Sequence, residues 1–149
     1  MQIVRLQIFF DINMNVIVTP IKTNQFGAGI ISLEYIKLIQ GWSNFELTHA
    51  IMSALETSLK NEPEDNQKLN FWTEATGIKS FSEFSKKHQC VSIVYRSDRN
   101  TYDITKEKRF KDGSYGLNID DVKYRIRTYQ GHPLADTIAD LVLETLKIE

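Results

Sequence analysis

The side chains best suited to nucleophilic or acid–base chemistry are few in this 149-residue chain. They are three histidines and one cysteine, namely His49, His88, His132 and Cys90. Covalent catalysis requires a nucleophile, a base and an orienting group held together in the fold, and none of these residues lies in a motif that supplies all three. We therefore expect a protein that is not an enzyme and has no catalytic residues.

Each of the four residues has a structural interpretation. His49 falls off the apolar stripe of a predicted helix, as a solvated surface residue does. His88 follows two lysines at a predicted helix C-terminus, where a cation is favoured. His132 precedes Pro133 at an N-cap-like position. Cys90 opens a predicted strand and is expected to be a small buried hydrophobe.

The sequence also lacks the spacing that a metal or cofactor site requires. It contains no HxxxH, CxxC or carboxylate-rich loop. Gly27-Ala28-Gly29 lacks the third glycine and the Lys-Ser/Thr of a phosphate-binding loop, and it leads into a predicted strand. We expect no metal and no cofactor.

Composition and charge indicate an ordinary globular domain. Hydrophobic residues make up 42% and charged residues 25% of the chain, and the formal net charge is −1. Such a charge creates no global attraction to nucleic acid or to an anionic membrane. The single cysteine suits a reducing compartment, and no apolar run approaches the ~18 residues of a membrane span. We expect a cytoplasmic protein without a membrane partner.

Period-two alternation predicts the first strands. Val4, Leu6, Ile8 and Phe10 share one face of a period-two segment while Arg5 and Gln7 point the other way, as in a half-buried strand. Residues 16–19 are β-branched and predict the second arm of a hairpin, with Pro20 ending it or marking an edge, because proline has no N–H to donate. Extended structure resumes at 30–33, whereas residues 35–39 fit either a strand or a helix.

Capping boxes mark the helices. Ser43 stands three residues before Glu46, and the apolar stripe that follows predicts a helix over 44–60. Residues 61–69 are polar and predict a loop. A second capping box and Gly77 predict short helices within 70–87.

The second half repeats this order. Residues 90–95 and 102–105 predict a hairpin, residues 122–128 alternate, and Pro133 suits the first turn of a closing helix over 133–147.

The two halves align without a gap at an offset of 87 positions. This offset places Val4 on Val91, Leu6 on Ile93, Ile8 on Tyr95, Ile17 on Ile104, Gly29 on Gly116, Ile51 on Ile138 and Leu55 on Val142. Amphipathic helices match at many offsets, but the strands agree at the same one. We infer a pseudo-duplication.

The predicted architecture is one α+β domain over 1–149, with an antiparallel sheet or two sheets. Its halves are 1–60 and 88–149, each strand-strand-helix, with a helical insertion over 61–87. The layout resembles the topology of the Whirly single-stranded-DNA-binding fold. Fold alone does not assign function.

A basic segment offers a surface of the kind that single-stranded nucleic acid binds. Cations and tyrosines on a sheet face suit such a ligand, but acidic residues interleave here and favour a solvated, salt-bridged face. The cations are Lys106, Lys108, Arg109, Lys111, Lys123, Arg125 and Arg127.

Acidic residues gather in two predicted loops. Loops on a rigid scaffold often carry recognition, and carboxylates would steer a basic partner. The predicted partner-binding residues are Glu62, Glu64, Asp65, Asp112, Tyr115, Asp120 and Asp121.

Two stretches resemble the CdiI immunity proteins of bacterial contact-dependent growth inhibition. They are Gly41–Leu47, which leads into the helix over 50–56, and Phe71–Phe81, which leads to Cys90–Ile93. The resemblance implies that the partner is the C-terminal toxin domain of a CdiA exoprotein, in many cases a nuclease such as a tRNase. It also implies neutralisation by stoichiometric blocking. No contact residues transfer, because the family diverges at its binding faces.

Our first hypothesis from the sequence is therefore a toxin-binding immunity protein, for which no direct nucleic-acid contact is expected. The alternative is a Whirly-like single-stranded nucleic-acid-binding protein, and an enzyme comes third. The oligomeric state stays open.

Overall fold

The computed structural model describes residues 3–23, 29–31, 34–59, 70–116, 127–130 and 137–148. The strands within these ranges are β1 (Ile3–Asp11), β2 (Val16–Thr23), β3 (Gly29–Ile31), β4 (Ile36–Leu38), β5 (His88–Arg96), β6 (Thr101–Arg109), β7 (Tyr115–Gly116) and β8 (Arg127–Gln130). The helices are α1 (Asn44–Leu59), α2 (Phe71–Thr76), α3 (Phe81–Lys86) and α4 (Thr137–Leu146).

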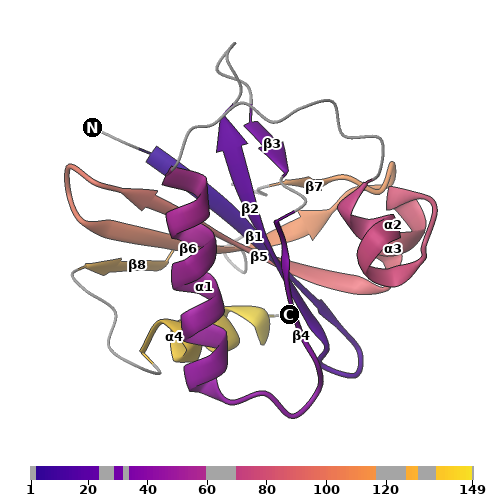
Figure 1. The fold of residues 1–149 in the computed structure, drawn as a ribbon, viewed down its shortest axis with the longest axis horizontal. Helices are drawn as coiled ribbons and strands as arrows, with labels where there is room; N and C mark the ends of the chain where they lie inside the picture. Colours follow the sequence, from indigo (N-terminus) through magenta and orange to yellow (C-terminus); the bar gives the residue numbers. More distant parts are fainter. Residues whose placement is uncertain are drawn as a thin grey trace.

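The strands form an antiparallel sheet whose order is β3-β2-β1-β5-β6-β7. In addition, β4 pairs with β2 and β8 pairs with β6. Figure 1 shows α1 and α4 on one face of this sheet, with α2 and α3 at one end. The predicted α+β class is confirmed, and the segment around Ile36 that sequence left open is a strand.

No helix in the described part of the chain is both long enough and apolar enough to cross a lipid bilayer.

The larger core lies between the sheet and the pair α1 and α4. Alternate residues of β1 point into it, which confirms the predicted alternation, and Leu6 and Ile8 are fully buried. Ile51 of α1 and Ile138 of α4 are fully buried against them. Burying a side chain of this size stabilises the fold by roughly 1.5–3 kcal/mol.

A second core covers one end of the opposite sheet face. Phe9 and Cys90 pack there against Phe71 of α2 and Phe84 of α3. The Phe9 ring lies 5.4 Å from Phe71 and 5.1 Å from Phe84 between centroids, close to the favoured spacing of aromatic pairs. The predicted insertion therefore does carry short helices, and they form a third layer.

The helix ends follow the predicted capping signals. At the start of α1, the Glu46 N–H donates to Ser43 Oγ over 3.1 Å, and the Ser43 N–H donates to the Glu46 carboxylate over 3.2 Å. Gly77 ends α2 with φ of 79°, a left-handed conformation that glycine adopts without strain. Glu83 N donates to Ser80 Oγ at the start of α3.

The central strand pair agrees with the 87-position offset. Leu6 is paired in register with Ile93, its counterpart at that offset. A twofold axis through this pair would exchange Val4 with Val91 and Ile8 with Tyr95, and the register does pair Val4 with Tyr95 and Ile8 with Val91. The division into two halves stays a proposal that this register supports.

The predicted match of Ile17 with Ile104 is wrong. Ile17 packs in the core beneath α2 and α3, whereas Ile104 points to the opposite face, toward α1 and α4. The β1–β2 register pairs Ile8 with Val18, and the β5–β6 register pairs Tyr95 with Tyr102. The hairpins therefore differ in register by an odd number of residues, which places matched side chains on opposite faces.

Pro20 does not end its strand. It pairs with Leu6 on one side of β2, and the strand continues to Thr23. On the other side, β4 pairs with residues 16–18 and β3 with residues 21–23, so that Pro20 lies between these two partners. Neither β3 nor β4 pairs with position 20, so the absence of a proline N–H costs no hydrogen bond to these two strands.

Lys106 belongs to the larger core rather than to a basic sheet face. Only 8% of its surface is exposed, and its Nζ donates to the carbonyl oxygen of Leu146 over 3.0 Å and to that of Ile148. These carbonyls lie at the C-terminal end of α4, where a cation is favoured by the helix dipole. Lys106 therefore holds α4 to β6.

This contact gives a stability prediction. Lys106→Met keeps the apolar stem and removes the charged donor, so the free energy of unfolding should fall by about 1.5–3 kcal/mol, the usual worth of hydrogen bonds to a charged group. Urea unfolding measures it. Lys108→Met, at an exposed position of the same strand, is the matched control and should change stability by less than about 0.5 kcal/mol. Equal effects of both substitutions would contradict the assignment.

Candidate functional site

The outer side of α1 forms a ridge between two hollows of the described surface. One hollow lies between α1 and the β5–β6 hairpin, and the other lies between α1 and β4. His49 and Ser53, one helical turn apart, line both of them. We call this surface the α1 ridge and the hollows the hairpin groove and the β4 groove.

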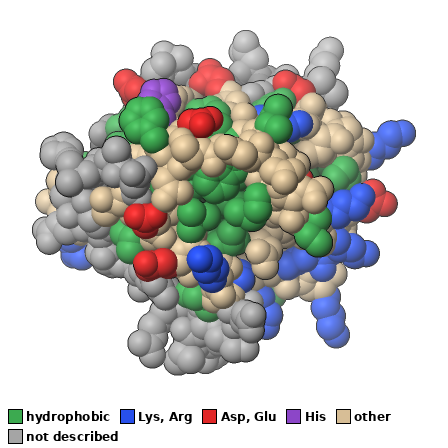
Figure 2. Space-filling model, turned by 90° about the horizontal axis from the view of Figure 1, so that it is seen from below, with side chains coloured by type: hydrophobic (Ala, Val, Ile, Leu, Met, Phe, Trp, Pro, Cys, Tyr) green, Lys and Arg blue, Asp and Glu red, His purple; other side chains and the backbone are tan. Residues whose placement is uncertain are grey.

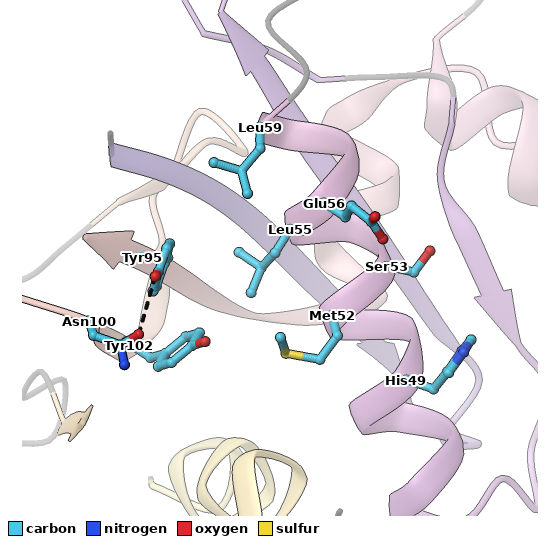
Figure 3. Close-up of a pocket in the computed structure, with 9 residues that line it drawn as sticks. All are labelled: His49, Met52, Ser53, Leu55, Glu56, Leu59, Tyr95, Asn100 and Tyr102. Atoms are coloured by element: carbon cyan, nitrogen blue, oxygen red, sulfur yellow. Dashed lines mark hydrogen bonds between the residues drawn. The ribbon is translucent and has the colours of Figure 1, made fainter. Parts of the chain in front are cut away.

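The hairpin groove has a volume of about 510 Å³. Figure 3 shows Met52, Leu55 and Leu59 pointing from α1 toward Tyr95 and Tyr102 across the groove. The two tyrosine rings lie 4.8 Å apart between centroids and are tilted by 36°. The groove thus has apolar side chains on its helix wall and two aromatic rings on its hairpin wall.

A hydrogen bond fixes the hairpin wall of the groove. The Tyr95 hydroxyl donates to Asn100 Oδ1 over 3.2 Å (Figure 3). Asn100 has φ of 50°, a left-handed conformation that asparagine tolerates better than most residues. The turn therefore holds its side chain at the mouth of the groove.

The β4 groove has a volume of about 420 Å³ and lies beside an exposed aromatic ring. Phe45 lines it together with Ile36 and Leu38 of β4, and 60% of the Phe45 surface is exposed. The Phe45 ring stacks on His49 at 6.5 Å between centroids. Large apolar residues exposed beside a groove are typical of binding surfaces.

The helical layer is acidic. Together α1 and α4 carry Glu46, Glu56, Asp140 and Glu144, and they contain no lysine or arginine. The two helices are joined where Asn44 Nδ2 donates to Asp140 Oδ1 over 2.6 Å. Figure 2, which views the end where α4 lies, shows hydrophobic side chains gathered in the middle, carboxylates scattered around them and most of the visible Lys and Arg side chains to the right.

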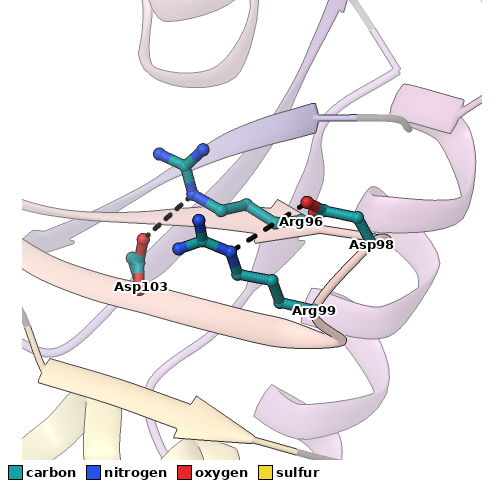
Figure 4. Close-up of polar contacts among 4 residues, drawn as sticks. All are labelled: Arg96, Asp98, Arg99 and Asp103. Atoms are coloured by element: carbon teal, nitrogen blue, oxygen red, sulfur yellow. Dashed lines mark hydrogen bonds and ion pairs between the residues drawn. The ribbon is translucent and has the colours of Figure 1, made fainter.

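The cations at the tip of the β5–β6 hairpin lie beside carboxylates. Arg96 Nε is 3.4 Å from Asp103 Oδ2, and Arg99 Nε is 4.0 Å from Asp98 Oδ2 (Figure 4). Exposed pairs of this kind contribute little to stability. They do reduce the positive field that the hairpin presents.

A polar cluster lies on the opposite sheet face, around the single cysteine. The Cys90 thiol donates to Glu107 Oε2 over 3.0 Å, and Gln7 Nε2 donates to the same oxygen over 2.8 Å. Burial and the neighbouring Glu107 carboxylate raise the pKa of the Cys90 thiol well above its ordinary value. A thiol held in its neutral form is a poor nucleophile, and the predicted role of a small buried residue is confirmed.

His88 lies beside this cluster, at the end of α3. Its Nδ1 is 2.7 Å from the Phe84 carbonyl oxygen, and its ring stacks on the Phe84 ring at 3.9 Å. Burial lowers the pKa of His88, and the carbonyl and the Asp11 carboxylate offset this only in part. His88 does contact a carbonyl of the last helical turn, as predicted, but the expected charged form is disfavoured.

Among the predicted partner-binding residues, the described part of the chain includes Asp112 and Tyr115. Asp112 is exposed, and hydrogen bonds from the hydroxyl and N–H of Ser114 lower the pKa of its carboxyl. The remaining five, Glu62, Glu64, Asp65, Asp120 and Asp121, lie outside the described residues.

The Tyr115 hydroxyl is hydrogen-bonded within the protein. It donates to the carbonyl oxygen of Ser85 or of His88, at 2.9 and 2.7 Å, and burial raises its pKa. The Tyr115 ring also packs against Phe9 and Phe81, so only part of the ring is left to contact a partner. Sequence analysis did not include the α1 ridge in the predicted binding set, although both predicted helices lack Lys and Arg before their last residues, Lys60 and Lys147.

The described residues contain no group of three or more His, Cys, Asp or Glu side chains arranged to hold a metal ion.

No family model and no curated protein sequence matches the chain. Among the solved structures that match, two are similar to nearly the whole chain. One is described as "CdiA-CT/CdiI toxin and immunity complex from Yersinia pseudotuberculosis"; a chain of it superposes with a TM-score of 0.71 at 10% identity, covering 98% of this chain and 97% of that one. The other is a "Protein of Unknown Function NMB0488 from Neisseria meningitidis", with a TM-score of 0.68 at 15% identity and 97% and 94% coverage.

This chain has the fold of a chain in a CdiA–CdiI complex. The resemblance to CdiI proteins that the sequence suggested is confirmed at the level of the fold.

The buried position of His88 gives a pH prediction. An unperturbed histidine titrates near pH 6.5, so below that pH the unfolded chain binds the proton more readily than the folded protein does. The free energy of unfolding should therefore decrease as pH falls from about 7 toward 5, and His88→Phe should flatten that decrease. Two-dimensional NMR of the His88 ring measures its midpoint directly. A midpoint at or above 6.5 would contradict the expected burial effect.

Proposed function

We propose that this protein is an immunity protein that binds the C-terminal toxin domain of a CdiA exoprotein and neutralises it without catalysis. The toxin is proposed to be a nuclease, such as a tRNase, and the mechanism to be one-to-one blocking of its active site or substrate surface. The protein is proposed to act in the bacterial cytoplasm, where such a nuclease would meet its substrate.

The observation that carries this proposal is the fold. It is shared over 98% of this chain with a chain of a toxin–immunity complex. The two chains have 10% identity, so the function is inferred from architecture and not from conserved side chains. The described site chemistry agrees with an inhibitor, because the one cysteine is buried and its thiol is held neutral.

Charge supports a basic partner. The layer formed by α1 and α4 bears carboxylates such as Glu46 and Glu56 and no Lys or Arg. A nuclease must attract a polyanion, so its substrate surface is basic. An acidic surface that meets it would accelerate association and exclude neutral partners.

The loop residues predicted from sequence extend this proposal. Glu62, Glu64 and Asp65 follow α1 in the chain, and Asp112, Tyr115, Asp120 and Asp121 belong to the segment after β6. We propose that they add contacts to the toxin, although Asp112 and Tyr115 do so beside α3, away from the layer formed by α1 and α4.

The alternative of a Whirly-like nucleic-acid-binding protein has less support. Lys106 is buried at the end of α4, and Arg109 donates through Nε to Ser85 Oγ over 2.7 Å. Arg96 and Arg99 lie beside carboxylates. These four cations are committed to the fold or partly neutralised, which weakens the attraction of this surface for a phosphate backbone. Lys108 and Lys111 are exposed, and the side chains of Lys123, Arg125 and Arg127 lie outside the described residues.

The proposal predicts that a CdiA exoprotein is encoded next to this gene, and the function is tested by co-expression with the toxin domain of that exoprotein. The protein alone should be tolerated by the cell, and its co-expression should restore growth to cells making the toxin. Size-exclusion chromatography with light scattering should show a one-to-one complex. Growth arrest by this chain alone would assign it the toxin's role, and failure to bind would refute the proposal.

The acidic loops are tested by charge reversal. Asp120→Lys with Asp121→Lys, and Glu62→Lys with Glu64→Lys, should each weaken the complex by about tenfold, since rim charges act mainly on the association rate. Surface plasmon resonance at low and moderate salt measures this. Unchanged association and unchanged protection of toxin-expressing cells would exclude these loops. A labelled single-stranded oligonucleotide, tested by fluorescence anisotropy, should not bind.

A further inference from the structure

Resting on the proposed function, we infer that the toxin domain docks across the α1 ridge. It seats an apolar or aromatic side chain in the hairpin groove and places Lys and Arg side chains against the carboxylates of α1 and α4. This goes beyond the loop residues predicted from sequence, because it assigns the centre of the interface to a helix that carries none of them.

The hairpin groove is suited to hold an anchoring side chain. Its walls are apolar on the helix side and aromatic on the hairpin side, with Tyr95 and Tyr102 opposite Met52 (Figure 3). A methionine adapts its shape to an incoming group and makes favourable contacts with aromatic rings. The dominant contacts of protein interfaces are anchors of this kind in well-packed pockets.

The hydrogen bond between Tyr95 and Asn100 makes one wall stiff before the partner arrives. The opposite wall belongs to α1, which is held by Ile51 and Leu55 in the larger core. A groove between two fixed walls loses little conformational freedom on binding, and this favours affinity.

The second hollow and Phe45 extend the same surface. Phe45 is 60% exposed and borders the β4 groove, so it can pack against the partner on the other side of the ridge. The ridge residue Ser53 is small and lines both hollows. A partner can therefore straddle α1 and contact both grooves.

The charge around the grooves selects a basic occupant. Glu56 lines the hairpin groove and Glu46 lines the β4 groove, and both are exposed. Neither α1 nor α4 contains a Lys or Arg that would repel a basic segment. An apolar centre with a charged rim is the usual anatomy of a specific interface.

The opposite sheet face is less suited to this role. Part of it is covered by α2 and α3, which bury Phe9 and Cys90. Polar groups next to that core, such as Glu107 and Gln7, are bonded to one another. Docking there would require breaking internal contacts, whereas the α1 grooves are not filled by any of the described residues.

Two substitutions on α1 test the proposal with the toxin domain encoded next to the gene as the probe. Ser53→Arg places a long cation at a partly exposed position that lines both grooves, and arginine is a good helix former. It should weaken the complex on the order of 100-fold, and Glu56→Arg about tenfold with a loss of salt dependence. Isothermal titration calorimetry measures both.

The matched control is Glu83→Arg. Glu83 is an exposed carboxylate on α3, beyond the other sheet face. It should leave the affinity within about twofold of the wild type, because it lies outside the proposed interface and its charge is screened beyond about 10 Å. Thermal unfolding of each variant confirms that its fold is retained.

The outcomes separate the two proposals. If the wild-type protein forms no complex and gives no protection, the proposed function fails. If it binds the toxin but Ser53→Arg and Glu56→Arg bind equally well, the α1 interface is wrong and the proposed function stands. A photo-crosslinking amino acid at position 53 gives an independent measurement. It should crosslink to a toxin segment rich in Lys and Arg, and a crosslink to an acidic segment would overturn the proposed partner chemistry.

Discussion

The structure depends on a central antiparallel pair of strands whose two faces are both buried at one end. Phe9 and Phe10 are neighbours in β1 and point to opposite faces, yet they are 0% and 2% exposed. In β5, the neighbours Cys90 and Val91 likewise point to opposite faces and are both fully buried. Two covering layers are required to bury such residues, so α1 and α4 must lie on one side and α2 and α3 on the other.

This three-layer requirement determines which surfaces a partner can reach. The inner faces of all four helices are used to close the two cores, and α2 and α3 are short. The outer side of α1, which spans sixteen residues, is the longest helical surface left to solvent in the described chain. Since α1 and α4 have only acidic charges, the surface that remains available is also electrostatically selective.

Local signals in the sequence predicted local structure well. The capping box at Ser43 and the left-handed Gly77 depend on residues a few positions apart, and so does the alternation of β1. The predicted match of Ile17 with Ile104 failed because it depends on where each hairpin turn closes. The two hairpin registers differ by an odd number of residues, and this places the two side chains on opposite faces of the sheet. Lys106 was assigned to a basic surface because its partners at the end of α4 lie about 40 positions away. Grooves are likewise formed by distant segments, so the α1 ridge could be found only after folding.

The low identity to the structural neighbours bears on how such a protein would achieve specificity. At 10% identity over nearly the whole chain, what two sequences must share is the apolar pattern that closes the cores, since many hydrophobic residues can replace one another there. Exposed positions on α1 are free of that constraint. Proteins of one fold can then discriminate among partners by changing anchors, grooves and charges on an unchanged scaffold. Specificity also requires that a non-cognate partner leaves charged groups buried without a counter-charge. Specificity on the proposed α1 interface would therefore depend on side chains particular to this protein, namely Ser53, Glu56 and the tyrosines of the hairpin.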